Sequence, residues 1–236
     1  VGASGEAIIF QVGNNGATEA MRITNAGNVG IGTTAPSVLF SVKGASRHGD
    51  DATNYAAISS TGALTYVGSA QPNRTMILTA QGGLLLSTQT TAQANVDGTN
   101  FAYSTLDYDQ TTSEKANWGF VIPDSFVGTT ATFTPYWTAA SGSGGVVWQF
   151  DTGGFADNEA FNGGALGGTA ATSTDTLLTA NAMHIGPAAT VTHDWTAGDF
   201  AVVEVARLPA DASDTLGADA RLIAVKIEWA AGAESD

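Results

Sequence analysis

The sequence predicts an all-β protein, in which a module of short strands precedes an antiparallel β-sandwich of the jelly-roll type. Its 236 residues include 29 glycines and many threonines and alanines, but only 8 Lys and Arg. This composition favours strands and tight turns over helices. No segment keeps a 3.6-residue apolar period, whereas several stretches alternate apolar and polar residues as strands do.

The N-terminal part contains short apolar stretches separated by turns rich in glycine and asparagine. Residues 7–12, for example, end in the Gly-Asn-Asn-Gly sequence of residues 13–16, which suits the positive φ of a tight turn. The strands expected here span residues 7–12, 20–24, 29–32, 38–42, 55–59, 64–67, 76–79 and 84–87. They have the usual length of strands, about five residues.

A single copy of this part would bury little apolar surface. Its aromatic residues in the first hundred positions are Phe10, Phe40, Tyr55 and Tyr66. Folding must offset a backbone entropy of about 1–2 kcal/mol per residue. We therefore expect several copies to share one apolar axis, which small side chains allow to be narrow. The alternative is that residues 1–100 drape over the second part as an extended arm.

The C-terminal part has longer strands with clear alternation. In the last one, Ile223, Val225, Ile227 and Trp229 alternate with more polar residues, so this set is expected to face the core. The strands expected here span residues 101–108, 118–122, 130–138, 146–150, 176–185, 200–208 and 221–229. Seven or eight antiparallel strands joined by long loops predict the β-sandwich or jelly roll.

Charge and tryptophan divide the chain in the same place. The net charge is −14, and residues 101–236 carry −13 of it, with seventeen acids, four bases and all five tryptophans. Residues 87–100 are polar and almost free of large apolar side chains. We therefore expect a trimerisation and attachment module at 1–86, a linker at 87–100 and an outward-facing head at 101–236.

Composition also excludes several classes of function. A strongly acidic chain is a poor partner for nucleic acid or for an anionic membrane surface. The absence of cysteine excludes disulfides, thiolate zinc sites and cysteine nucleophiles. No apolar run approaches the roughly 20 residues of a membrane span, so we expect no membrane insertion. No P-loop, nucleophile elbow or metalloprotease motif occurs, and we expect no catalytic residues, cofactor or resident metal.

Three histidines are candidates for acid–base chemistry. His48 lies in a polar stretch and is expected in a solvated loop, whereas His184 lies in an apolar run and is expected in the core. His193 precedes Asp194, but neighbours on a strand point to opposite faces, which argues against a direct pair. Two suitably spaced carboxylates could still cleave a glycosidic bond. With seventeen acids in the head, no single pair stands out.

The most distinctive loop spans residues 151–164, DTGGFADNEAFNGG. Its acids and amide could bind Ca²⁺, and its aromatic rings could stack on a sugar or pack on a partner protein. The alternative is an ordinary solvated loop between strands. The candidate ligand- or partner-binding residues are Phe155, Asp157, Asn158, Glu159 and Phe161.

One stretch resembles a known family. Residues 20–42, AMRITNAGNVGIGTTAPSVLFSV, resemble the A-M-R-I-x-x-x-G-N-V-G-I-G-T-x-x-P-x-x-x-L-x-V segment of bacteriophage tail fibres and tailspikes. The residues that carry the resemblance are Gly27, Asn28, Val29, Gly30, Ile31, Gly32, Thr33 and Pro36. Residues 214–222 are similar, more weakly, to jelly-roll modules of phage structural proteins.

The resemblance implies an intertwined, trimeric β-structure on the surface of a virion. It also implies a homotrimer that contacts other virion proteins at its N-terminal side and a host-surface glycan or protein at its head. In that family an autoproteolytic chaperone domain, recognised by a Ser-Asp start and an Arg-Leu-Lys run, often follows, and we find no such domain here. Self-cleavage is therefore not expected, unless such a domain has already been removed from the chain.

Three hypotheses follow. In the favoured one, the chain is a fibre or spike protein whose jelly roll attaches the particle to its host. In the second, the jelly roll binds or depolymerises a polysaccharide. In the third, it is a decoration or cement module between virion proteins.

Overall fold

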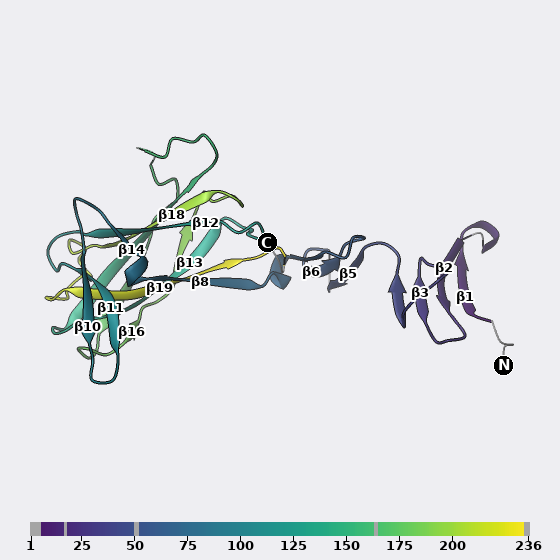
Figure 1. Cartoon of the computed structure of the whole chain (residues 1–236), viewed down its shortest axis with the longest axis horizontal. Coiled ribbons are helices and arrows are strands. Elements are labelled where there is room, and N and C mark those ends of the chain that lie inside the picture. The colour runs from purple at the N-terminus through teal and green to yellow at the C-terminus, as the bar shows by residue number, and fades with distance from the viewer. Residues whose placement is uncertain (1–5, 17, 50–51, 163–164, 234–236) are drawn as a thin grey trace. The chain divides into compact units, whose positions relative to one another are not determined.

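The computed structural model describes residues 6–16, 18–49, 52–162 and 165–233 (Figure 1). The chain divides into two compact units. Residues up to Gln71, together with Gly232 and Ala233, form the N-terminal unit, and Pro72–Ala231 form the C-terminal unit. The division therefore lies at Gln71, before the linker expected at residues 87–100.

The N-terminal unit contains two small sheets. The first has the order β1-β2-β3-β4 and is antiparallel except for the parallel pair β3 and β4. The second is the antiparallel meander β5-β6-β7. The strands are β1 (Ile8–Val12), β2 (Thr18–Ile23), β3 (Val29–Ile31), β4 (Phe40–Val42), β5 (Ser46–Gly49), β6 (Tyr55–Ile58) and β7 (Leu64–Val67). Two 3₁₀ turns, η1 (Asn14–Gly16) and η2 (Gly68–Ala70), also belong to it.

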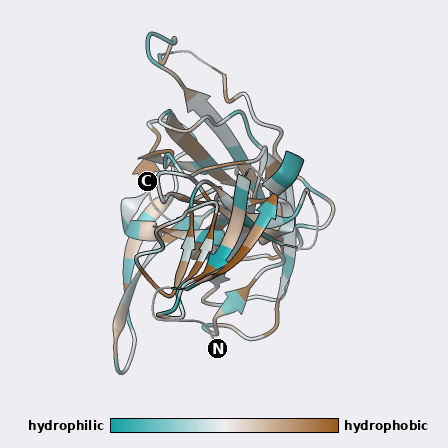
Figure 2. Cartoon of the chain, turned by 90° about the vertical axis from the view of Figure 1, so that its right-hand side faces the viewer, coloured by the Kyte–Doolittle hydropathy of each residue, from teal (hydrophilic) through white to brown (hydrophobic). Residues whose placement is uncertain are grey.

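The strands of the C-terminal unit are longer and form two larger sheets. Figure 2 shows brown apolar residues recurring along the strands. The bounds are β8 (Asn73–Thr79), β9 (Leu84–Leu85), β10 (Ala92–Asp97), β11 (Ala102–Tyr108), β12 (Lys115–Val121), β13 (Thr130–Thr138), β14 (Gly144–Phe155), β15 (Ala171–Leu177), β16 (His184–Ile185), β17 (Ala189–Thr192), β18 (Phe200–Arg207) and β19 (Ala220–Ala230), with one 3₁₀ turn, η3 (Ala80–Gly82).

The strand order confirms the expected jelly roll. One sheet contains β11, β19, β13 and β17 as neighbours, and the other contains β15, β14, β18 and β12. Numbered along the chain without β16, these eight strands give the orders 1-8-3-6 and 5-4-7-2. Two four-stranded antiparallel sheets connected in this way form the double Greek key of a jelly roll. Strands β8, β9, β10 and β16 extend the two sheets.

The polar segment expected as a linker is part of the sandwich. Within residues 87–100, β10 pairs along its whole length with β11. Before it, β8 pairs with residues 224–230 of β19. Most side chains of β10 are exposed, and only Ala94 and Val96 are half-buried. A solvated edge strand needs no apolar face, and its composition therefore resembles that of a loop.

Two further expectations are corrected. The strand expected at 176–185 is interrupted, because Asn181 has a φ of 60° in a turn between β15 and β16. Tyr136 of β13 pairs with Ala224 of β19, and Trp137 of β13 pairs with Leu222. Ile223 is therefore an extra residue in a bulge of β19. The bulge shifts the alternation by one residue. Leu222 is therefore buried, while Ile223 is only half-buried.

Aromatic rings from both sheets fill the core. Phe133 of β13 stacks on Phe150 of β14 with ring centroids 5.4 Å apart, and Tyr108 of β11 meets Trp148 of β14 edge to face at 5.1 Å. All of these side chains are fully buried. Each pair joins one sheet to the other, and such pairs add about 0.5–1.5 kcal/mol beyond the area they bury.

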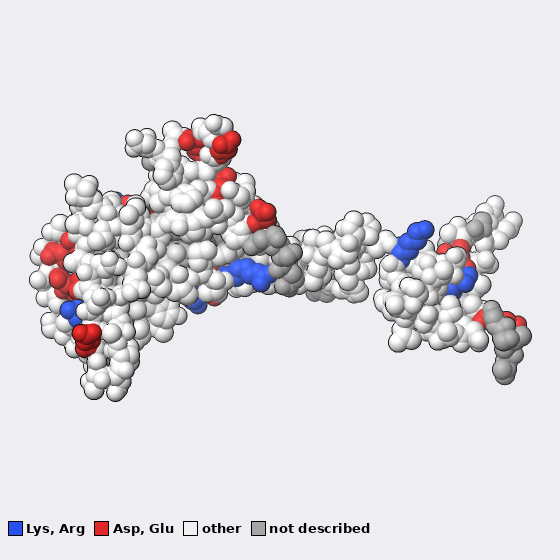
Figure 3. Space-filling view, in the orientation of Figure 1, with Lys and Arg blue, Asp and Glu red and all other residues white. Residues whose placement is uncertain are grey.

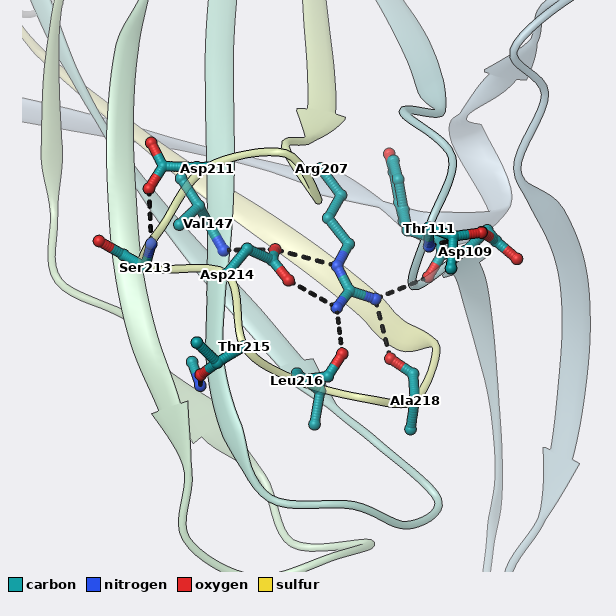
Figure 4. Close-up of polar contacts among 12 residues, drawn as sticks. Asp109, Thr111, Val147, Arg207, Asp211, Ser213, Asp214, Thr215, Leu216 and Ala218 are labelled. Carbon is teal, nitrogen blue, oxygen red and sulfur yellow. Dashed lines mark hydrogen bonds and ion pairs between the residues drawn. The ribbon is translucent and has the colours of Figure 1, made fainter.

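Arg207 is the one charged residue among the fully buried large side chains of the described chain. Its guanidinium binds both carboxylate oxygens of Asp214, at 3.0 and 2.8 Å. It also donates to the carbonyls of Leu216 and Ala218, at 2.7 and 2.8 Å (Figure 4). These contacts tie the loop between β18 and β19 to the end of the sandwich.

Among the residues described here, no helix has the length and apolar character required to cross a bilayer.

Candidate functional site: an aromatic pocket on the β-sandwich

The two aromatic candidates of the 151–164 loop lie together. Phe155 ends β14, and Phe161 lies in the loop that follows it. Their rings meet edge to face at 4.9 Å, and Phe161 meets Phe200 of β18 in the same way at 5.7 Å. Phe161 keeps 60% of its surface exposed and Phe200 keeps 40%. The three rings form an exposed aromatic cluster, which is rare on a surface that binds nothing.

The polar candidates make hydrogen bonds within the loop itself. Glu159 accepts a hydrogen bond from the backbone N–H of Ala156 at 2.9 Å, and Asn158 donates to Asp157 at 2.9 Å. Asn158 also adopts a left-handed φ of 63°. These side chains therefore shape the loop. Among the described residues, no group of three His, Cys, Asp or Glu side chains is placed to hold a metal ion.

The cluster forms one wall of a cavity of about 520 Å³. This volume lies within the range of small-molecule sites, about 300–1,000 Å³. The lining is apolar apart from one amide, and it comes from β9, β12, β14, β18 and the loop after β14. Its residues are Leu84, Asn117, Trp118, Gly119, Phe155, Phe161, Leu166, Phe200 and Val202.

Two glycines of the sheet make room for two side chains that line this pocket, Phe200 and Leu166. Gly153 of β14 and Gly119 of β12 lie on either side of Val202 of β18 in the sheet register. A Cβ on Gly119 would lie 2.5 Å from the ring of Phe200, and one on Gly153 would lie 3.0 Å from the Leu166 side chain. Neither side chain could keep its place over a larger residue. The two glycines therefore allow the Phe200 ring and the Leu166 side chain to lie directly over the sheet.

The next row along the same sheet is polar. Asp151, Glu204 and Asn117 are cross-strand neighbours on β14, β18 and β12. Glu204 binds the ammonium group of Lys115 at 2.7 Å. The Oδ1 atom of Asn117 is buried and has no hydrogen-bond partner among the described residues. The pocket thus lies between an aromatic cluster and a polar row that contains one unsatisfied acceptor.

The surroundings of the pocket are acidic. Asp157 and Glu159 belong to the same loop as Phe161, and Figure 3 shows red atoms gathered on a loop that projects from the C-terminal unit. Asp151 and Glu204 lie in the adjoining row, where Lys115 neutralises only Glu204. The lining itself contains no cation. This field disfavours anionic ligands.

Most of the pocket could not be identified from local sequence. Phe155 and Phe161 were found because they are aromatic residues between glycines. Phe200, Val202 and Gly119 were missed, since only the pairing of β18 with both β12 and β14 brings them together. The one available signal was a glycine between two large residues in a strand, as in Trp118-Gly119-Phe120. Such a glycine indicates that another group lies close to the strand backbone.

The fibre-like segment forms its own hydrogen-bonded turn in the N-terminal unit. Asn28 donates from its side chain to the carbonyl of Pro36 at 3.1 Å, and its backbone N–H donates to Thr24 Oγ1 at 3.1 Å. A Cβ on Gly30 would lie 2.8 Å from the carbonyl oxygen of Thr33. Gly27 and Gly32 have φ values of 84° and 68°, which favour glycine. Val29 and Ile31 are in β3. The positions of glycine and asparagine in the segment are therefore explained by contacts within one chain.

The described residues of the N-terminal unit form no apolar core of their own. Of its described residues, only Gly30 and Pro36 are buried. Large apolar side chains remain exposed on its strands and turns, among them Phe10 (52%), Leu39 (74%) and Phe40 (58%). The others are Ile8, Ile9, Val12, Ile31, Val38, Ile58 and Leu64. All the buried hydrophobic core residues of the described chain lie at or after Leu78.

The three histidines lie outside the pocket, and two of them are buried in the β-sandwich. His48 is exposed on β5, where a loop was expected. His184 is buried, as predicted, and its Nε2 accepts from the backbone N–H of Leu178 at 2.9 Å. His193 is buried while Asp194 is exposed and accepts from the N–H of Gly154, so the two do not pair. None of the three lines the pocket.

His193 should make stability depend on pH. Burial, against Phe126 and stacked on Trp195, lowers its pKa, although nearby Asp194 opposes the shift. Between the unfolded pKa, about 6.5, and the lower folded pKa, the unfolded chain binds more protons. Stability should therefore fall as pH drops below about 6.5. Urea denaturation at pH 7.5 and 5.5 should show a smaller loss in His193→Asn. His48→Asn should keep the wild-type loss, and equal losses in all three proteins would contradict the assignment.

No protein-family model and no curated protein sequence matches the chain. Among solved structures, the chain is similar to a CBM35 module from Cellvibrio japonicus Abf62, with 11% identity and a TM-score of 0.38 over 68% of this chain and 99% of the module. It is also similar to a carbohydrate-binding module of the β-sandwich superfamily, with 11% identity and a TM-score of 0.30 over 98% of this chain and 93% of that one. At these TM-scores, neither similarity bears on function.

Proposed function

We propose that the chain is a structural fibre or spike protein of a bacteriophage particle. Its N-terminal unit assembles the homotrimer and joins it to other virion proteins. Its C-terminal jelly roll faces outward and recognises a glycan on the host surface. The N-terminal unit thus serves assembly, and the C-terminal unit serves recognition.

The observation that carries the proposal is the missing core of the N-terminal unit. A unit whose strands keep Phe10 and Phe40 about half exposed loses much of the favourable free energy of burial, about 25 cal/mol per Å² of apolar surface. Contact with further copies of the same unit would recover it. Residues 20–42 resemble a segment that is trimeric in phage fibres, which supports three copies. The near-neutral charge of residues 1–71, which hold three bases and four acids, permits such packing.

The purified chain should therefore be a stable trimer. Light scattering coupled to gel filtration at micromolar concentration should give three times the chain mass of 23.9 kDa. Phe10→Asp with Phe40→Asp should lower that mass, because each places a charge on the shared apolar surface. Phe101→Asp, a change at an exposed ring of the other unit, should leave it unchanged. A wild-type monomer under these conditions would contradict the shared-axis assembly.

The pocket supports recognition by the head. Aromatic rings offer flat apolar faces to the C–H face of a sugar ring, and one amide can fix its orientation. Catalysis is the weaker alternative. Asp151 and Glu204 are neighbours across two strands, but Lys115 neutralises Glu204 and neither carboxylate lines the pocket. Binding without release of shorter oligosaccharides separates a recognition head from a depolymerase.

A cement role is the second candidate. Leu84 of the pocket lining and Val121, the cross-strand neighbour of Phe200, are exposed at 71% and 62% and could pack on a neighbouring virion protein. Particle density that shows the jelly roll pointing outward would favour host recognition. A jelly roll covered by other virion proteins would favour cement.

A further inference from the structure

We propose that the aromatic pocket binds an alkylated ammonium group, of the trimethylammonium kind, carried by the host-surface glycan that the head recognises. This inference deepens the proposed function and rests on it. Three observations on the cavity carry it. Its lining includes four aromatic side chains, the lining contains no base, and carboxylates lie around it.

Four aromatic side chains line the cavity. The ring of Phe161 lies nearly perpendicular to that of Phe155, at 74°, and to that of Phe200, at 73°. Trp118 also lines the cavity, although only 5% of its surface is exposed. A group held in the angle between perpendicular rings can contact more than one aromatic face. Because the face of an aromatic ring attracts a cation within about 6 Å, this arrangement favours a compact cation with an apolar surface.

The rest of the lining favours an alkylated ammonium group over a primary one. Asn117 is its one polar side chain, and the Oδ1 atom of that residue is buried. A primary ammonium group has three N–H donors, which would lose their water here and find no side-chain acceptor in the lining. A trimethylammonium group has no N–H donor, and its methyl groups would gain contact with Leu84 and Leu166. The cavity of about 520 Å³ has room for such a group.

Carboxylates lie around the cavity without lining it. Asp157 and Glu159 are exposed in the loop that carries Phe161. The carboxylate of Asp194 accepts a hydrogen bond at 2.8 Å from the backbone N–H of Gly154, which immediately precedes a lining residue. Together these charges attract a cation toward the apolar walls and repel an anion.

The bases near the cavity are already paired. Strands β9, β12, β14 and β18 contain two bases, Lys115 and Arg207. Lys115 binds Glu204 at 2.7 Å, and Arg207 binds Asp214 at 2.8 Å. The described residues that line the cavity include no Lys, Arg or His. A carboxylate or phosphate brought into the pocket would therefore find no counter-ion, which excludes acidic substituents from the pocket itself.

A matched set of small probes, titrated into the full-length protein by ligand-observed NMR, tests the inference. The probes are choline, tetramethylammonium, 3,3-dimethyl-1-butanol and ethanolamine. The dimethylbutanol has the shape of choline with a neutral carbon in place of the nitrogen, and ethanolamine keeps the charge without the methyl groups. We expect choline to bind at least about fivefold tighter than either, because cation–π attraction adds to apolar contact. Tetramethylammonium should compete with choline.

Three results of this series would overturn the inference. The first is binding of 3,3-dimethyl-1-butanol as tight as that of choline, which would make the pocket merely apolar. The second is tighter binding of ethanolamine than of choline, which would remove the need for methyl groups. The third is no detectable binding of choline or tetramethylammonium at millimolar concentration.

Phe161→Leu separates the aromatic face from the apolar volume. Leucine keeps an apolar side chain at this exposed position but removes the ring. Choline should therefore lose most of its preference over 3,3-dimethyl-1-butanol, whereas the alcohol should bind nearly as before. Phe101→Leu, at an aromatic residue that is 72% exposed and outside the pocket, is the matched control and should change neither affinity. A full choline preference in Phe161→Leu would contradict the role of the rings.

Salt and charge variants test the acidic surroundings. Raising the salt concentration from about 50 mM to about 500 mM should weaken choline binding and leave the neutral alcohol unaffected. Asp157→Asn combined with Glu159→Gln should weaken choline about two- to fivefold. The glutamine can still accept from the backbone N–H of Ala156, so the loop keeps its shape. Choline affinity that responds neither to salt nor to this double variant would refute an electrostatic contribution and, with it, the inference.

Failure of the inference differs from failure of the proposed function. Neutral bacterial surface polysaccharides that bind at Phe161, in a protein without choline preference, would leave glycan recognition intact and remove only the ammonium substituent. No binding of any probe, nor of a panel of bacterial surface polysaccharides, would remove both.

Discussion

Replacing Arg207 with alanine should destabilise the C-terminal unit by about 3–5 kcal/mol, the usual loss when one partner of a buried ion pair is removed. The guanidinium has no exposed surface, and the Asp214 side chain is 1% exposed. Without Arg207, the Asp214 carboxylate would stay buried. The backbone N–H of Val147, 3.0 Å from its Oδ2, would remain as a donor. The carbonyls of Leu216 and Ala218 would lose their donor as well.

Lysine should not rescue this site. A guanidinium presents its donors in a flat fork, and Arg207 uses that fork on Asp214 and on three carbonyls, including that of Tyr108. An ammonium group is a point charge and cannot reach all of these acceptors. We expect Arg207→Lys to recover less than half of the lost stability.

Arg221 provides the matched control. It pairs with Asp107 at 3.3 Å, but its side chain is 25% exposed. Exposed pairs contribute about 0–1 kcal/mol, so Arg221→Ala should have a small effect. Urea denaturation followed by tryptophan fluorescence measures all three variants. If Arg207→Ala and Arg221→Ala lost similar stability, Arg207 would not be the anchor of the loop between β18 and β19.

The sandwich could be predicted from sequence wherever one face of a strand is buried. Val225, Ile227 and Trp229 were expected on one face of the last strand and are all in the core, because alternation reports burial directly. Strand β10 was missed for the same reason, since an edge strand in solvent shows no alternation. The bulge at Ile223 was missed because the sequence keeps alternating apolar and polar residues through it, whereas the side chains before and after the bulge change faces.

The pocket could be predicted only in part, for a different reason. Two of its lining residues, Val202 and Gly119, form one row of the sheet with Gly153, and the three come from strands that are distant in sequence. Local pattern gives strands but not their register, and a shift of one residue would turn this row into the core. The aromatic loop residues could be predicted, whereas the surface under them required the fold.

Removing residues 1–71 should convert the protein from a trimer to a folded monomer. The cut falls at the division between the units, and every buried core hydrophobic of the described chain lies at or after Leu78. The sandwich therefore keeps its core, while the exposed apolar strands that would hold the copies together are lost. Light scattering should give the mass of one chain, and tryptophan fluorescence should show a cooperative transition in urea.

A longer truncation tests the boundary itself. Removing residues 1–100, as the composition of the chain suggests, would also remove β8, β9 and β10. Strand β8 pairs with seven residues of β19, and Leu78 and Ala80 are in the core. Their loss exposes the edge of a central sheet, which favours aggregation. We expect the 72–236 fragment to be soluble and to denature cooperatively, and the 101–236 fragment to aggregate. A stable, monomeric 101–236 fragment would show that β8 is not an integral strand of the jelly roll, and a trimeric 72–236 fragment would show that assembly depends on the head.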